Sequence, residues 1–188
     1  MPRLPLALLA ATLVLAGCDG DDSLLGEFEG QVVVTGDARA VDGEAVYTIV
    51  ETDRGPEFVL GLFVGDLYES DFDAYDYVLF RRPGRRPGVG AYAIDDDPTS
   101  AVGASLARVD EADEPRDAEG YALVGTDGTL AVTRVDGYGF VAGTFRLEAE
   151  GLAVGRPERR LTGTASGRFE ARYEPPATFR RLGLDLGL

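Results

Sequence analysis

The chain contains no histidine, lysine, asparagine or tryptophan, and its single cysteine is Cys18. Without histidine, the Ser-His-Asp and Cys-His catalytic arrangements are impossible, as are histidine-ligated zinc, iron and copper sites. One cysteine cannot form a disulfide within the chain. The groups left for catalysis are carboxylates, hydroxyls, tyrosines and arginines, a poor set for most hydrolases. We therefore predict that the protein is not an enzyme and carries no cofactor.

Positive charge is also scarce. The chain has 18 basic residues, all of them arginine, against 33 acidic ones, which gives a formal net charge of −15. A surface this acidic repels the phosphates of nucleic acid, so we exclude nucleic acid as a partner. An acidic surface also stays hydrated in a salty medium.

Long hydrophobic runs are missing except at the N-terminus, where one begins after Arg3 and ends in Leu15-Ala16-Gly17-Cys18. A basic start, a short apolar segment and small residues before a cleavage point are the features of a secretory signal peptide. The run is too short to remain in a bilayer as a spanning helix. We predict a signal helix over residues 1–17 that is cleaved between Gly17 and Cys18.

The string L-A-G-C resembles the lipobox of bacterial lipoproteins. In that family the cysteine is lipidated on sulfur, the signal is cut before it, and the new amine is acylated. The resemblance implies that Cys18 holds the protein to a membrane and that residues 18–24 form a lipidated cysteine with an acidic tether. An ordinary signal peptide with a chance cysteine is the alternative. We expect a lipid-anchored protein of the cell envelope, at the outer membrane in preference to the inner, on either its periplasmic or its surface face.

From Leu25 onward, apolar and polar residues alternate with the period of two that is typical of half-buried strands. Asp-Gly turn signals at 42–43, 126–129 and 136–139 separate several of the runs. We predict a single antiparallel β domain over residues 25–176, an all-β fold built as a β-sandwich or a partly open barrel. Residues 177–188 are expected to form a C-terminal tail or an edge strand. The expected core comprises Phe28, Val32, Tyr47, Phe58, Leu60, Leu62, Leu79, Leu130, Val132, Phe145, Leu147 and Phe169.

The second half of the chain carries three motifs in order: D-G-T-L-A-V-T-R-V-D-G (127–137), V-A-G-T-F-R-L-E-A (141–149) and L-T-G-T-A-S-G-R-F-E-A-R-Y (161–173). This pattern resembles a recurrent one in small, uncharacterised lipoproteins of gram-negative bacteria, which share a G-T-F strand and a closing G-x-F strand. The resemblance implies an all-β lipoprotein domain and brings no catalytic residue with it.

Two charged clusters are candidate binding sites. Asp71, Asp73 and Asp76 alternate in a segment where their carboxylates could bind calcium through oxygen ligands, although the EF-hand spacing is not met. The alternative is a solvated acidic loop. Arg81, Arg82, Arg85 and Arg86 form the tandem repeat R-R-P-G-R-R-P-G, which could grip phosphate or carboxylate groups. The alternative is a hairpin tip whose arginines pair with acidic neighbours.

Aromatic and acidic residues give two weaker signals. Tyrosines near the acidic segment (Tyr68, Tyr75 and Tyr77, with Phe72) would suit a sugar-binding face. Glutamates on several predicted strands (Glu27, Glu29, Glu148, Glu150 and Glu170) would allow a carboxylate pair for glycoside hydrolysis, with no two singled out by spacing. The sequence as a whole favours a membrane-anchored, non-catalytic binding or structural β domain that contacts another envelope protein or a glycan. A calcium-dependent or carbohydrate-binding module is the second hypothesis, and a carboxylate-pair glycoside hydrolase is the third.

Overall fold

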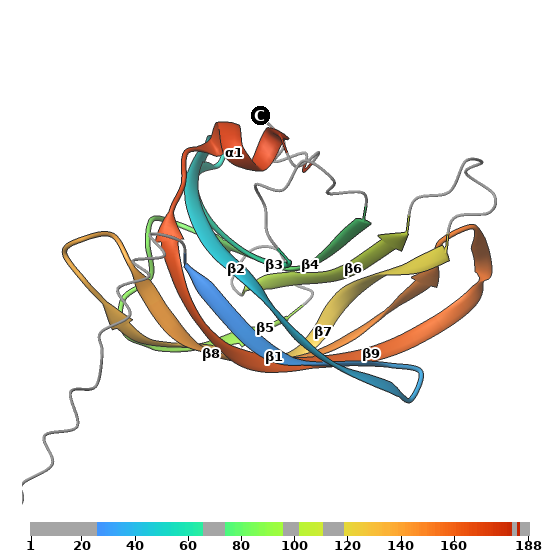
Figure 1. Ribbon diagram of the computed structural model, residues 1–188. Helices are drawn as coiled ribbons and strands as arrows, with labels where there is room; N and C mark the ends of the chain where they lie inside the picture. Colours follow the sequence, from blue (N-terminus) through green and yellow to red (C-terminus); the bar gives the residue numbers. More distant parts are fainter. Residues whose placement is uncertain (1–25, 66–73, 96–101, 111–118, 182–183, 185–188) are drawn as a thin grey trace, which may run out of the picture.

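The computed structural model describes residues 26–65, 74–95, 102–110, 119–181 and 184, and it confirms the predicted all-β fold (Figure 1). The predicted signal helix and Cys18 lie outside these residues. The elements are β1 (Glu27–Val34), β2 (Asp37–Thr52), β3 (Gly55–Val64), β4 (Ala74–Pro83), β5 (Gly90–Ile94), β6 (Gly103–Asp110), β7 (Glu119–Val135), β8 (Val141–Ala153), β9 (Arg156–Tyr173) and α1 (Pro176–Arg181).

The strands belong to one sheet that closes on itself. Each strand pairs with an antiparallel neighbour in the order β1, β2, β3, β4, β6, β7, β8 and β9, and β9 pairs again with β1. The strand β5 continues the line of β6 along the same edge of β7. Closure reduces the unpaired strand edges of the kind that invite aggregation. This ring matches the partly open barrel that we expected as one of two architectures.

Two of the three predicted Asp-Gly turns are wrong, and both fall at bends within long strands. Gly43 lies inside β2, where that strand begins to pair with β3. Gly128 lies inside β7, beside a bulge, where β7 changes partner from β6 to β5. Its φ of +142° and the carbonyl oxygen of Arg146, 2.1 Å from where a Cβ would stand, both require glycine. The turn at 136–139 is confirmed, since it joins β7 to β8.

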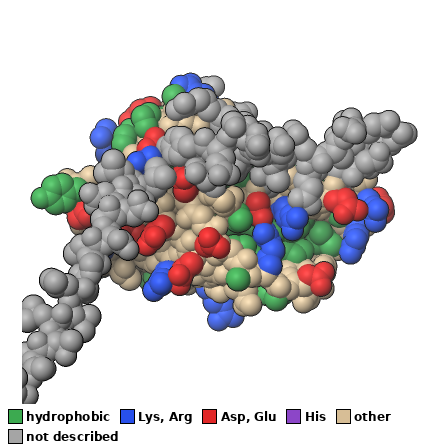
Figure 2. Space-filling view, in the orientation of Figure 1, with side chains coloured by type: hydrophobic (Ala, Val, Ile, Leu, Met, Phe, Trp, Pro, Cys, Tyr) green, Lys and Arg blue, Asp and Glu red, His purple; other side chains and the backbone are tan. Residues whose placement is uncertain are grey.

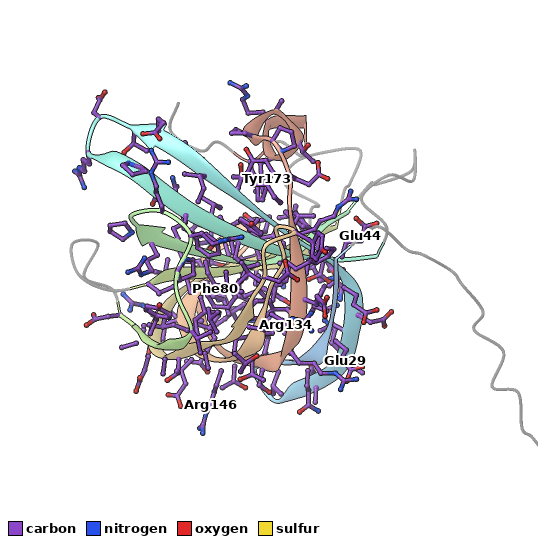
Figure 3. All side chains as sticks on the ribbon, turned by 90° about the vertical axis from the view of Figure 1, so that its left-hand side faces the viewer. Glu29, Glu44, Phe80, Arg134, Arg146 and Tyr173 are labelled. Atoms are coloured by element: carbon purple, nitrogen blue, oxygen red, sulfur yellow. The ribbon has the colours of Figure 1, made fainter. Side chains whose placement is uncertain are left out.

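Apolar side chains fill the ring, because every second residue of each strand points inward. Figure 3 shows Phe80 inside the ring, where it packs edge-to-face with Phe145 at a centroid distance of 5.6 Å. All the core residues expected from the alternation are buried, which confirms that prediction. Leu79 differs from the others in packing on the outer side of the sheet.

A second apolar cluster covers the outside of β2, β3 and β4. Its centre is Phe179 of α1, which is fully buried against Phe63 at a ring-centroid distance of 6.1 Å. We considered an edge strand for residues 177–188. That prediction is wrong for residues 177–181, because they belong to α1. The alternation behind that expectation runs over residues 182–188, of which the structure describes Leu184 alone.

The helix α1 should depend on Phe179 for its position. We expect Phe179→Ala to lower the free energy of unfolding by about 3 kcal/mol, because truncating a buried aromatic leaves a cavity. Arg180→Ala, on an exposed residue of the same helix, should change it by less than about 0.5 kcal/mol. Urea denaturation of both variants measures the difference, and equal effects would show that α1 is not held by this contact.

The ring has two distinct ends (Figure 1). One end, which we call the anchor end because the chain enters it from the predicted anchor at Cys18, holds the start of β1, the end of β9 and the β2–β3, β4–β5 and β7–β8 connections. The mouth end holds the β1–β2, β3–β4, β6–β7 and β8–β9 connections. The antiparallel pairing of successive strands around the ring fixes this division.

Candidate functional site at the mouth end

Among the described residues, the pairing around the ring has a gap at its mouth end. The strand β3 pairs with β2 from Glu44 onward, and Gly65 forms a bridge with Gly43 and donates its N–H to the carbonyl of Asp42. No described residue pairs with residues 37–41 of β2 on that side. The side chain of Arg39 crosses this gap. Its Nη1 lies 2.5 Å from Oδ2 of Asp76 on β4, and its Nη2 donates a hydrogen bond of 2.7 Å to Oδ1. Nη2 also donates to the hydroxyl of Tyr121 on β7 at 3.1 Å.

We call Arg39, Asp76 and Tyr121 the clasp, because they join three strands that share no ladder at this point. Burial would lower the pKa of Arg39, but hydrogen bonds to Asp76 and Tyr121 outweigh it and place that pKa above its ordinary value. Burial raises the pKa of the Tyr121 phenol, and the hydrogen bond from Arg39 offsets part of the rise. The clasp therefore holds a charged guanidinium against a neutral phenol at physiological pH.

Strand register places the clasp beside another arginine. Asp76 stands directly across from Arg108 on β6, and Arg108 stands directly across from Tyr121 on β7. These residues form one row along the inner face, so Asp76 has arginines on two sides. The row follows from the pleat alone, since residues opposite each other on neighbouring strands point the same way.

Two members of the clasp, Arg39 and Tyr121, line a cavity of about 320 Å³. Three arginines from three strands line it: Arg39, Arg108 and Arg159. Arg159 is exposed and makes no ion pair with the described residues. The floor of the cavity is apolar, and the rest of its rim is polar. The full lining is Val32, Val34, Thr35, Asp37, Arg39, Arg108, Glu119, Gly120, Tyr121, Ala153, Arg159 and Leu161.

The aspartate cluster predicted to bind calcium is not described as a whole. Asp71 and Asp73 lie outside the described residues. Asp76 points into the ring, where Arg39 engages both of its carboxylate oxygens. In the part of the chain that the structure describes, no three acidic, cysteine or histidine side chains are grouped so that they could hold a metal ion.

We predicted that four arginines form an anion-binding site. In the structure, these arginines contact four different partners. Arg81 points outward and pairs with both carboxylate oxygens of Glu57, at 3.2 and 2.8 Å. Arg82 lies 4.9 Å from the ring centroid of Tyr92.

The other two arginines of this repeat lie nearer the tip of the loop. Arg85 is 3.8 Å from Glu51, and Arg86 donates to the backbone carbonyl of Asp136 at 3.2 Å. The geometry agrees with the alternative of a hairpin tip whose arginines pair with their neighbours.

The candidate glutamates are split between two areas. Glu27, Glu29 and Glu170 line a shallow outer groove of about 640 Å³, and Figure 2 shows acidic side chains gathered over β1 and β9. Arg168 contacts Glu29 at 2.8 Å, and Arg134 contacts Glu170 at 2.6 Å.

Both of these glutamates are well exposed, at 61 and 43 % of the side chain. They therefore lack the apolar enclosure that makes a carboxylic acid a proton donor at neutral pH. Glu148 and Glu150 lie on β8, where Glu148 is 3.6 Å from Arg146.

The proposed sugar-binding aromatics are described only at Tyr77. This side chain is half-buried on the outer face beside Phe63, at a centroid distance of 6.2 Å, and burial raises the pKa of its phenol. Tyr68 and Phe72 lie outside the described residues, as does the side chain of Tyr75.

The cavity at the mouth was not predicted from the sequence. None of its lining residues was a candidate site residue, although Asp76, which pairs with Arg39 of the lining, was one. Its lining comes from six strands, and its arginines are separated by up to 120 positions in the chain (Arg39 to Arg159). The available signal was an arginine at an inward position of an alternating strand, as at Arg39 before Val41 and at Arg159 before Leu161. An inward charge near a strand end indicates the rim of a ring.

No family model, curated protein or solved structure matches the chain. None of the described residues belongs to a helix that is long and apolar enough to cross a membrane. The arguments that follow therefore rest on the residues and their geometry.

Proposed function

We propose that the protein is a lipid-anchored lipoprotein of the cell envelope whose β domain binds a small acidic saccharide at the mouth of the ring, without catalysis. The anchor is supported by the signal-like N-terminus and by the L-A-G-C string at the chain's one cysteine. The location at the outer membrane stays a prediction, as does the face of that membrane, periplasmic or surface, on which the domain lies. The binding role rests on the cavity at the mouth.

One observation carries the binding proposal: three arginines converge on one cavity in a chain with a net charge of −15. Arginine presents a planar fork of donors that matches a carboxylate or phosphate. Because Arg39 already forms an ion pair with Asp76, the exposed Arg159 is the arginine best placed to bind a ligand anion.

The rest of the rim defines the other part of the ligand. Asp37 and Glu119 are exposed carboxylates, which accept hydrogen bonds and repel a second anion. A ligand with one acidic group and several hydroxyls satisfies both kinds of side chain. The cavity volume lies at the lower end of the range of small-molecule sites, which suits one or two sugar units. A uronic acid has this chemistry.

The experiment measures binding of glucuronate by calorimetry, with glucose as the neutral control. We expect glucuronate to bind and glucose to bind at least tenfold more weakly. Glucose lacks the carboxylate and therefore loses a charge-assisted hydrogen bond, which contributes roughly 1.5–3 kcal/mol. Arg159→Ala should weaken glucuronate binding by roughly the same factor.

Arg160→Ala is the matched control. Arg160 is the next residue, equally an exposed arginine, and it does not line the cavity. Its loss should leave glucuronate binding unchanged. Equal weakening by the two variants would assign binding to general surface charge, and absence of glucuronate binding would refute the ligand class.

A further inference from the structure

Large apolar side chains are exposed at the anchor end of the ring. Tyr138, in the β7–β8 turn, is 95 % exposed, and Val89, just before β5, is 69 % exposed. Tyr173, at the end of β9, is about half exposed, and Figure 3 shows it at this end near α1. Exposed aromatic and aliphatic side chains grouped at one end of a soluble fold indicate a contact surface.

These side chains sit on connections that touch one another. Arg86 of the β4–β5 loop donates to the carbonyl of Asp136 in the β7–β8 turn. The carboxylate of Asp136 in turn accepts the backbone N–H groups of Phe140 and Tyr138, at 3.0 and 2.9 Å, which lower its pKa. The turn is therefore ordered, and Tyr138 projects from a fixed support.

Arginines accompany the apolar side chains. Arg85 is 80 % exposed at the tip of the β4–β5 loop, and its contact with Glu51 is long, at 3.8 Å. Arg86 lies on the same loop, three residues before Val89. Tyrosine and arginine both have an apolar body and a polar tip, which suits the boundary between lipid headgroups and acyl chains.

The chain's path brings this end close to the anchor. The strand β1 starts at Glu27, at the anchor end, nine residues after Cys18. Nine residues span at most about 30 Å when fully extended. If Cys18 carries lipid, as the proposed function states, the anchor end is the part of the domain held nearest to the bilayer.

We infer that the anchor end of the ring rests on the bilayer that holds the lipid anchor, with Tyr138 and Val89 at the headgroup boundary and Arg85 on the lipid phosphates. The occupant of this surface is thus the membrane itself. This inference rests on the proposed anchor. It also orients the molecule: the cavity at the mouth faces away from the membrane, toward soluble ligands.

The absence of tryptophan makes the test direct, because one introduced indole reports alone. Tyr138→Trp places the probe at the anchor end. Leu152→Trp is the matched control, since Leu152 is an exposed apolar residue on β8 near the mouth end. Each lipidated chain, purified from membranes, is reconstituted into phosphatidylcholine vesicles with or without brominated acyl chains.

We expect brominated lipid to quench the Tyr138→Trp protein roughly twofold, with a blue shift on the order of 10 nm, because an interfacial indole leaves water. The Leu152→Trp protein should show neither effect. Flotation of the vesicles is measured on the same samples. Protein that floats with the vesicles but is equally unquenched at both positions would overturn the inference while leaving the anchor intact. Protein that does not float would refute the anchor and the inference together.

Discussion

Replacing Cys18 with alanine is expected to remove the mature protein from the membrane fraction. Each buried acyl CH₂ contributes about 0.8 kcal/mol, so two or more chains anchor a protein stably and their loss abolishes the anchoring. The measurement is fractionation of cells followed by detection in pellet and supernatant. We expect either a soluble product or a larger precursor that keeps residues 1–17.

The control for this experiment is the double variant Asp21→Ala and Asp22→Ala, which changes the acidic tether and keeps the cysteine. It should remain in the membrane fraction. A Cys18→Ala protein that is cleaved normally and still sediments with membranes would contradict the lipid anchor.

Replacing Arg39 with alanine is the second substitution with a large expected effect. Removal of Arg39 leaves the Asp76 carboxylate, 11 % exposed, without the guanidinium that binds both its oxygens. It also unlinks β2 from β4 and β7 at the gap. Breaking a buried ion pair costs about 3–5 kcal/mol, and partial exposure of Arg39 reduces this to about 2–3 kcal/mol in the free energy of unfolding.

The matched control is Arg168→Ala, which removes a pair of similar length between neighbouring strands. Arg168 and Glu29 are 72 and 61 % exposed, so solvent screens them and the expected loss is less than about 1 kcal/mol. Urea denaturation of both variants gives the comparison. If Arg39→Ala costs no more than Arg168→Ala, the clasp does not hold the mouth together.

The alternation of side chains was enough to predict the fold class and the core. Away from the mouth, inward positions are apolar because they face the filled ring, so Phe58, Leu60 and Leu62 could be identified from spacing alone. Turn signals were less informative. Asp-Gly permits a chain reversal, but the same glycine conformation permits a bend inside a strand, as at Gly43 and Gly128.

The same alternation explains why neighbouring arginines of the repeat have separate partners. Arg81 and Arg82 are adjacent in a strand, so their side chains leave on opposite faces, one toward Glu57 and the other toward Tyr92. The cavity at the mouth could not be predicted for a different reason. Its side chains share the inner face, and they come together only because the ring closes. Closure depends on strand register, which the local sequence does not specify.

The most direct test of the lipoprotein assignment is the mass of the mature protein extracted from native membranes. Intact-mass and N-terminal peptide spectrometry reads the first residue and any group attached to it. The account predicts a chain that begins at Cys18 and carries acyl groups on its sulfur and its amine. A mature chain that begins at another residue, or a Cys18 with a free thiol, would contradict it.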